Sequence, residues 1–145
     1  TMPAPATGVT MSLALEGLQC SIKHDPSGTQ LSTVPPKDNG GTGASFSPTD
    51  LVGAALASCA VTTIALVAAR EGLTFSGARA TVEKRMTPPP RRIGELVLLI
   101  DMPAGTKVEQ RPRLEEIART CPVARSLHPD VKLPFIFRYP EMPFS

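Results

Sequence analysis

The feature that most constrains this chain is a stretch of nineteen residues, Leu51 to Ala69, without a charged side chain. The residues before it, SPTD at positions 47–50, place a hydroxyl, a proline and an acid where they favour the start of a helix. Gly72 follows, and glycine favours the end of one. The pattern predicts a helix from Leu51 to about Glu71. A helix that is apolar on every side must span a membrane or be covered all round by protein.

The composition of this stretch favours cover by protein. Seven of its nineteen residues are Ala, and Gly, Ser and Thr add to them, so it is only weakly apolar for a membrane span. A single domain of 145 residues has few elements to surround such a helix. A second copy of the chain would supply the missing cover, so we expect a homodimer and no membrane partner. A membrane span is the alternative, and solubility without detergent tests it.

Elements on both sides of this helix follow from the spacing of apolar residues. Alternation predicts an N-terminal meander of three strands, a later hairpin and a closing strand, whereas helical spacing and Pro122 predict two short helices before that last strand. The predicted strands of the meander are residues 10–15, 19–23 and 29–34, and those of the hairpin are 78–83 and 93–100. The predicted short helices are residues 108–120 and 122–127, and the closing strand is 131–139. The order predicts an α+β fold in one domain, residues 1–145, with antiparallel sheets around the central helix.

Composition and charge exclude several classes of protein. With 41% hydrophobic residues and a net charge of +2, the chain is neither a disordered polyelectrolyte nor an acidic solvating chain. It has no Trp and one Tyr, which disfavours nucleic-acid binding. Residues 1–8 form a Pro/Ala tract without features of a secretory signal, so we expect a cytoplasmic protein. That tract is expected to be disordered or left from an expression vector, as Thr1 before Met2 suggests.

The candidate chemistry rests on sulfur. The three cysteines are too few for a disulfide scaffold and lack the spacing of a zinc site, so no metal is expected. Cys59 lies midway along the predicted helix, Cys121 precedes Pro122 and Cys20 lies on a predicted strand. A free cysteine is often only a small buried hydrophobe, and this reading stays open for all three. Likewise, the interpretation of Asp50 as a helix cap without a role in the chemistry stays open.

Two motifs together indicate a family. The segments SPTDLVGAALASC, residues 47–59, and CPVARSL, residues 121–127, resemble those of the OsmC/Ohr family of osmotically inducible and organic hydroperoxide resistance proteins. The resemblance covers nearly the whole chain. It implies an intertwined homodimer in which sheets enclose two long central helices, and so implies cover for the apolar helix.

The resemblance also implies a thiol-dependent peroxidase that needs no cofactor. Cys59 matches the peroxidatic position, where a thiolate attacks the O–O bond of a hydroperoxide and becomes a sulfenic acid. Cys121 matches the resolving position and would form a disulfide with Cys59, which an external thiol or dithiol reductant would then reduce. Cys20 matches neither motif. Small aliphatic residues around Cys59 favour an organic hydroperoxide over hydrogen peroxide.

The chain departs from the family pattern beside the thiolate. Peroxidase members have Glu where this chain has Thr49, with Asp50 one place later, and they supply an Arg from the N-terminal strands, whereas no Arg precedes Arg70 here. A cysteine in the middle of a helix gains little from the helix dipole, and apolar burial disfavours its thiolate. The candidate replacements for the missing cation are Lys23, Lys37 and Arg125.

The spacing of Asp50 and Cys59 bears on how the site is built. Nine residues separate them, about 13 Å along a helix that rises ~1.5 Å per residue. If Asp50 assists Cys59, it does so across the dimer, and the site contains residues of both subunits. The alternative function is a non-catalytic small-molecule-binding protein of the stress response, which kept the fold and thiols but lost the activating residues.

Overall fold

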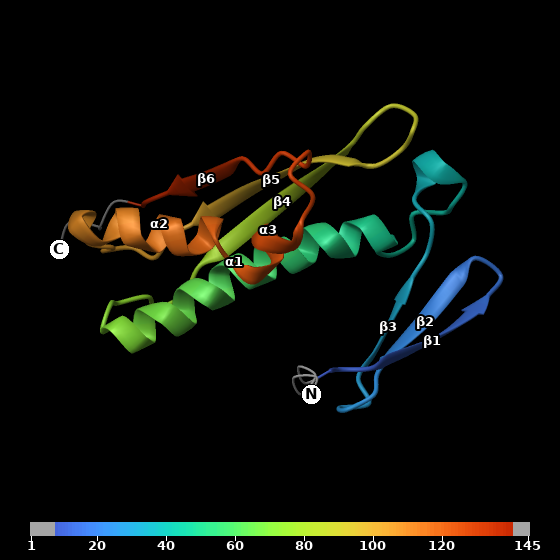
Figure 1. Ribbon diagram of the computed structural model, residues 1–145, viewed down its shortest axis with the longest axis horizontal. Coiled ribbons are helices and arrows are strands. Elements are labelled where there is room, and N and C mark those ends of the chain that lie inside the picture. The colour runs from blue at the N-terminus through green and yellow to red at the C-terminus, as the bar shows by residue number, and fades with distance from the viewer. Residues whose placement is uncertain (1–7, 141–145) are drawn as a thin grey trace, which may run out of the picture. The chain divides into compact units, whose positions relative to one another are not determined.

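The computed structural model of the protein describes residues 8–140 and has the predicted α+β composition (Figure 1). The expectation for the N-terminal tract lies outside the described residues, except for Gly8. The chain divides into two compact units, residues 1–51 and 52–145, which are described separately. The long helix α1, Pro48–Glu71, begins in the first unit and runs through the start of the second.

The N-terminal unit is the predicted three-stranded meander. Its strands are β1 (Met11–Glu16), β2 (Gln19–His24) and β3 (Gln30–Thr33), which pair antiparallel in the order β1-β2-β3. Gly17, in the turn between β1 and β2, has a φ of 62°, a conformation that glycine adopts without steric cost. The expected loop after β3 contains one short 3-10 turn, Lys37–Asn39.

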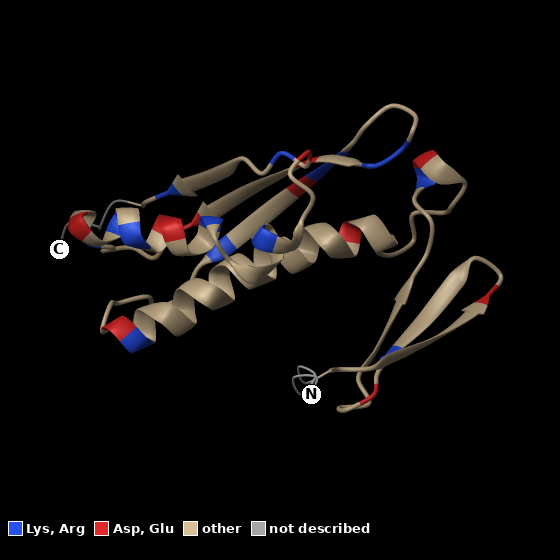
Figure 2. Cartoon of the chain, viewed as in Figure 1, with Lys and Arg blue, Asp and Glu red and all other residues tan. Residues whose placement is uncertain are grey.

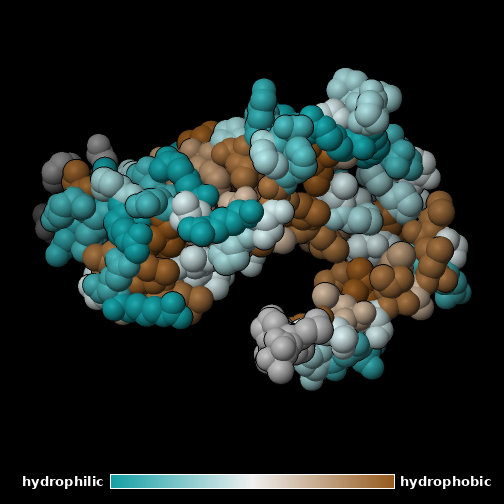
Figure 3. Space-filling model, viewed as in Figure 1, coloured by the Kyte–Doolittle hydropathy of each residue, from teal (hydrophilic) through white to brown (hydrophobic). Residues whose placement is uncertain are grey.

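One face of this sheet is apolar and exposed. The pairing register places Leu13 opposite Ile22, and Ile22 opposite Leu31, on the same face. Met11, Leu13 and Leu15 are 64%, 67% and 66% exposed, and the hydrophobic surface of these strands is visible in Figure 3. Alternation therefore predicted the strands correctly, but it did not show what covers them.

The C-terminal unit contains a second three-stranded sheet in the order β4-β5-β6. The strands β4 (Arg79–Met86) and β5 (Ile93–Asp101) form the predicted antiparallel hairpin. The strand β6, Phe135–Arg138, is shorter than expected and pairs parallel to β5, so this sheet is mixed rather than antiparallel. The reason is the connection: the helical segment between β5 and β6 crosses back over the sheet, and such a crossover returns the chain in the same direction.

Helix α1 packs one face against this sheet. At Gly53 the helix lies against β4 and β5, because a Cβ there would lie 3.5 Å from the Leu96 side chain and 3.6 Å from the Val82 side chain. The buried residues recur at helical spacing: Gly53, Leu56, Ala60, Ile64 and Ala68. The opposite face, which includes Leu66 at 53% exposure, is not buried by the described residues of the C-terminal unit, 52–140. The expectation of cover all round is therefore not met within that unit.

The ends of α1 agree with the sequence signals. The backbone N–H of Ser47 donates to Asp50 Oδ2 at 2.8 Å, and the N–H of Asp50 donates to Ser47 Oγ at 3.1 Å, which is a reciprocal capping box. Gly72, just after the helix, has a φ of 71°. Between Asp50 and Arg70 the helix is without charge (Figure 2), and by length and composition it is the one described helix that could cross a membrane.

Two short helices place Cys121. Helix α2 (Arg111–Arg119) follows a 3-10 turn at Val108–Gln110, and helix α3 (Pro122–Ser126) begins directly after Cys121. The predicted apolar stripe of α2 is buried: Leu114, Ile117, Ala118 and Cys121. The guanidinium of Arg113 forms a bidentate pair with Glu71 at the end of α1. Packing and this ion pair hold the segment before Cys121 against α1.

Candidate functional site

Cys59 lies near the middle of α1, on the border of its buried face. It is half-buried and packs against the core cluster of the C-terminal unit. Its neighbour Ala60 is fully buried, whereas Ser58 is exposed, so the thiol lies between the core and the solvent side of the helix. A cysteine in this position has an apolar environment and is not completely buried.

Cys121 meets Cys59 although 62 residues separate them in the chain. Cys121 is fully buried in the same core cluster, at the junction of α2 and α3. Its thiol has a hydrogen-bonding interaction with the Cys59 side chain. Both cysteines are free thiols here. The two thiols that the sequence motifs single out are therefore neighbours, which is the arrangement that disulfide exchange between them requires.

The surroundings of Cys121 favour its protonated form. Burial raises the pKa of the Cys121 thiol above its usual value, and the hydrogen bonding and charge of Cys59 raise it further. The backbone N–H groups of Ala124 and Val123, at the start of α3, oppose this shift. In its protonated form, Cys121 can donate its S–H in a hydrogen bond to the neighbouring Cys59 side chain.

A third polar group contacts the pair. The Cys59 Sγ lies 3.8 Å from the Oγ1 of Thr63, within the reach of a hydrogen bond that involves sulfur. Thr63 follows Cys59 by one helical turn on α1, where side chains four residues apart are neighbours. Sequence reasoning did not select Thr63. The spacing of four residues between a cysteine and a hydroxyl on a predicted helix was the signal that could have found it.

The three candidate cations lie in different places. Arg125 is one turn after Cys121 on α3, but its Nε donates to the backbone carbonyl of Thr120 at 2.8 Å. Lys23 is exposed on β2, and Lys37 begins the 3-10 turn beside Gly43. Both lysines belong to the N-terminal unit. The side-chain hydrogen bond of Arg125 in the C-terminal unit is therefore to a backbone carbonyl and not to the sulfur of Cys59 or Cys121.

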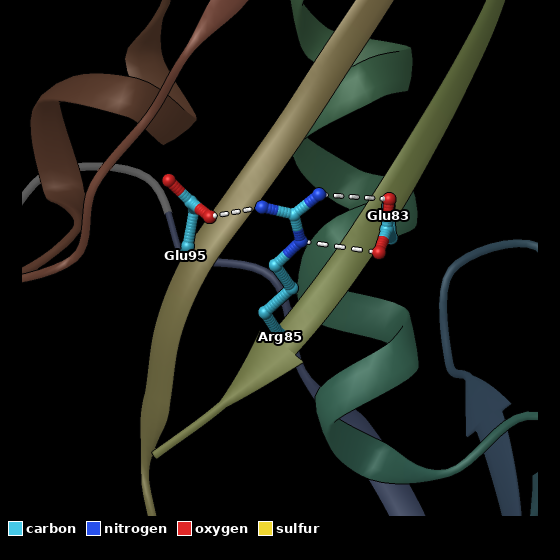
Figure 4. A network of polar contacts seen from close by, with 3 residues as sticks. All are labelled: Glu83, Arg85 and Glu95. Carbon is cyan, nitrogen blue, oxygen red and sulfur yellow. Dashed lines mark hydrogen bonds and ion pairs between the residues drawn. The ribbon is translucent and has the colours of Figure 1, made fainter.

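Another cation of the C-terminal unit, Arg85 on β4, forms ion pairs with two glutamates rather than with Cys59. Its guanidinium lies between Glu83 and Glu95, with N–O distances of 3.1 and 2.8 Å (Figure 4). Glu83 and Arg85 occupy the positions of β4 that alternate with Val82, and Val82 is the residue that faces Gly53 of α1. Arg85 therefore lies on the sheet face away from the helix that bears Cys59.

Asp50 and Thr49 belong to the cap of α1. Asp50 accepts from the backbone of Ser47, and the Oγ of Ser47 lies 3.2 Å from the Oγ1 of Thr49. Because α1 is continuous from Pro48 to Glu71, the sequence separation of Asp50 and Cys59 corresponds to about 13 Å along the helix axis. The helix therefore does not bring these two residues of one chain together.

Cys20 and the two histidines lie apart from the thiol pair in the sequence and have contacts of their own. Cys20 is half-buried on β2, opposite Leu15 and Thr33. His24 Nδ1 lies 2.6 Å from Ser27 Oγ, and His128 Nδ1 accepts from the backbone N–H of Asp130 at 3.0 Å. Among residues 8–140, no group of three or more His, Cys, Asp or Glu side chains could hold a metal ion.

Comparison with known proteins places the fold and the family. The model of the OsmC-like protein family matches residues 41–134, a range that includes both cysteines of the pair. A crystal structure from Psychrobacter arcticus 273-4, named as a candidate osmotic stress induced and detoxification response protein, is 35% identical with a TM-score of 0.83. The match covers 92% of this chain and 98% of that one. No curated protein matches the sequence significantly.

More distant structures share the fold. An organic hydroperoxide resistance protein OsmC from Legionella pneumophila is 18% identical, with a TM-score of 0.75 over 92% of this chain and 98% of that one. The organic hydroperoxide resistance protein OhrB of Bacillus subtilis is 16% identical, with a TM-score of 0.67 over 91% of this chain and 98% of that one. At these identities the likeness concerns the arrangement of the backbone.

Proposed function

Because this chain belongs to the OsmC-like protein family, we propose that it is a thiol-dependent peroxidase that reduces organic hydroperoxides through Cys59 and Cys121. The observation that supports this most directly is the meeting of the two thiols, one half-buried and one fully buried, from distant parts of the chain. The names of the Legionella and Bacillus relatives, which refer to organic hydroperoxide resistance, agree with this reaction class.

The proposed cycle has three steps. The Cys59 thiolate attacks one oxygen of the hydroperoxide, the O–O bond breaks, and the alkoxide takes a proton and leaves as an alcohol. Cys59 is then a sulfenic acid. The Cys121 thiolate attacks the Cys59 sulfur, the S–S bond forms, and water leaves after a proton is taken up. An external thiol or dithiol finally reduces the disulfide by exchange, which supplies the two electrons that the peroxide consumed. No cofactor or metal takes part.

The surroundings of Cys59 favour an apolar substrate. The side chain packs among aliphatic groups of the core cluster, and the polar side chains that interact with it in residues 52–140 are those of a threonine and a second cysteine. An alkyl group would lose unfavourable contact with water in such a place, whereas hydrogen peroxide would have few hydrogen-bonding partners. We therefore place organic hydroperoxides before hydrogen peroxide as substrates.

The working form that we propose is a cytoplasmic homodimer in which each chain acts as one domain. Two apolar surfaces support association with a second copy: the exposed face of the β1-β2-β3 sheet and the outer face of α1. Asp50 then has a route to Cys59 of the partner, as the separation along one helix does not give it one within its own chain. Light scattering should give twice the mass of one chain, and a stable, active monomer would contradict this assembly.

A second function is a small-molecule-binding protein without catalysis. It is favoured by the sequence, which has Thr49 at the position of the family's Glu and no Arg before Arg70. The two functions differ in the reactivity of Cys59. Rapid alkylation of Cys59 at neutral pH would favour the enzyme, and inertness until alkaline pH would favour the binding protein.

The experiment that tests the enzyme is peptide mass mapping of the reduced protein after brief treatment with a stoichiometric alkyl hydroperoxide. We expect a disulfide between Cys59 and Cys121, and we expect it to be absent from the Cys59→Ser variant. If both thiols remain unmodified in the unaltered protein, the peroxidase is wrong, and the protein should be searched for a bound ligand instead.

A further inference from the structure

Cys59 has neutral hydrogen-bonding partners. Within residues 52–140, the polar side chains that interact with it are those of Thr63 and Cys121. A thiolate is stabilised by hydrogen bonds to its charged form as well as by a nearby cation. The hydroxyl of Thr63 is the partner that belongs to the same rigid helix as Cys59, so its position requires no rearrangement of the fold.

We propose that Thr63 is a positioning residue of the peroxidase: its hydroxyl donates a hydrogen bond to the Cys59 thiolate and so increases the fraction of Cys59 that is ionised at neutral pH. The role of Thr63 in the reaction rests on the proposed function. The hydrogen bond itself does not, because the ionisation of Cys59 is measured without any peroxide.

The donor and the acceptor of the hydrogen bond between Thr63 and Cys59 follow from the chemistry of the thiolate. A thiolate has no proton to donate, so in the reactive state the Oγ–H of Thr63 must be the donor and the Cys59 sulfur the acceptor. Thr63 is half-buried beside Cys59, which limits the competition from water. The adjacent Thr62 is exposed on another side of α1, and it provides a matched control of the same residue type.

The test measures the alkylation rate of Cys59 by iodoacetamide against pH. In a background of Cys20→Ser and Cys121→Ser, Cys59 is the only thiol, and the serine that replaces Cys121 keeps a donor. Thr63→Val removes the hydroxyl while the side-chain volume stays nearly constant. Thr63→Ala also removes the hydroxyl and replaces Thr63→Val in the test if the valine variant does not fold. Thr63→Ser keeps the hydroxyl, and Thr62→Val removes one outside the site.

We expect Thr63→Val to move the midpoint of the rate profile to higher pH and to slow alkylation at neutral pH about tenfold. Thr63→Ser and Thr62→Val should stay within about twofold of the background at every pH. An unchanged midpoint in Thr63→Val would overturn the inference, and so would a lower plateau at high pH without a shift, because that pattern reports steric hindrance alone.

The experiments distinguish a failure of the Thr63 hydrogen bond from a failure of the proposed peroxidase activity. If an alkyl hydroperoxide produces no Cys59–Cys121 disulfide in the unaltered protein but Thr63→Val shifts the midpoint, the proposed peroxidase activity is wrong and the proposed hydrogen bond is supported. If the disulfide forms and the midpoint does not move, the peroxidase stands and the role of Thr63 is wrong.

Discussion

The two units of this protein differ in how they bury their apolar residues. In the C-terminal unit, Leu98 and Ile64 are completely inaccessible to solvent, since a helix and a sheet cover each other. In the N-terminal unit, the apolar face of the meander is exposed, with Leu13 at 67%. In its described part, residues 8–51, the first unit has strands but no second layer that covers them, whereas the second unit has the two packed layers that a core needs.

The three cysteines are also distributed differently between the two units. Cys59 and Cys121 lie in the C-terminal unit, where packing fixes their neighbours, and Cys20 lies on β2 of the N-terminal sheet. A reactive pair needs two sulfurs held at a constant separation, which a close-packed core provides. The comparison teaches that the unit with two packed layers holds the two neighbouring thiols, whereas the sheet of the other unit has an exposed apolar face.

The sharpest test of this division compares cysteine variants in steady-state reduction of an alkyl hydroperoxide. We expect Cys59→Ser to lower the rate about a thousandfold or more, because the nucleophile is gone. Cys20→Ser should retain the rate of the unaltered protein. Equal losses in the two variants would break the comparison, since the N-terminal thiol would then take part in the reaction.

The next largest effect concerns the two apolar surfaces. Leu98→Ala should lower the free energy of unfolding by about 2–5 kcal/mol, because it leaves a cavity in a fully packed core. Leu13→Ala should instead shift the equilibrium between dimer and monomer on dilution. Urea unfolding measures the first quantity and light scattering over a dilution series the second. Unaltered association in Leu13→Ala would show that this face is not the dimer contact.

The pH dependence of disulfide formation probes the core around Cys121. Only the thiolate attacks a sulfenic acid, and the pKa of Cys121 is raised, chiefly by burial. The resolving step should therefore speed up about tenfold for each pH unit until pH reaches that raised pKa. Stopped-flow measurement of the second step after peroxide addition gives this rate. A rate that is flat from neutral to alkaline pH would contradict a buried, protonated Cys121.

The smallest effect concerns the start of α1, which connects the two units. Ser47→Ala removes the Oγ that accepts from the N–H of Asp50, and we expect a loss of about 1 kcal/mol in the free energy of unfolding. The neutral-pH alkylation rate of Cys59 should not change, as Cys59 lies three turns further along the helix. A slower alkylation would mean that the cap also sets the geometry of the thiol.

Much of the fold was predictable because its signals are local. The charge-free stretch, the cap at Ser47 and Gly72 gave the end of α1 and placed its start within three residues of Pro48, and alternation gave the N-terminal meander and the hairpin. The parallel pairing of β6 with β5 was not predicted, because strand direction depends on the path of the intervening helices and not on the pattern of residues within the strand.

For the site, the sequence by itself determined which residues are the candidates. The motifs around Cys59 and Cys121 single them out, and the missing Arg and Glu are visible in the sequence alone. Only the tertiary structure decided that the two thiols meet and that Cys121 is buried in the core, whereas the contact of Thr63 with Cys59 follows from helical spacing. The physical reason is that the helix period fixes neighbours four residues apart, whereas contact across 62 residues depends on how α2 and α3 pack against α1.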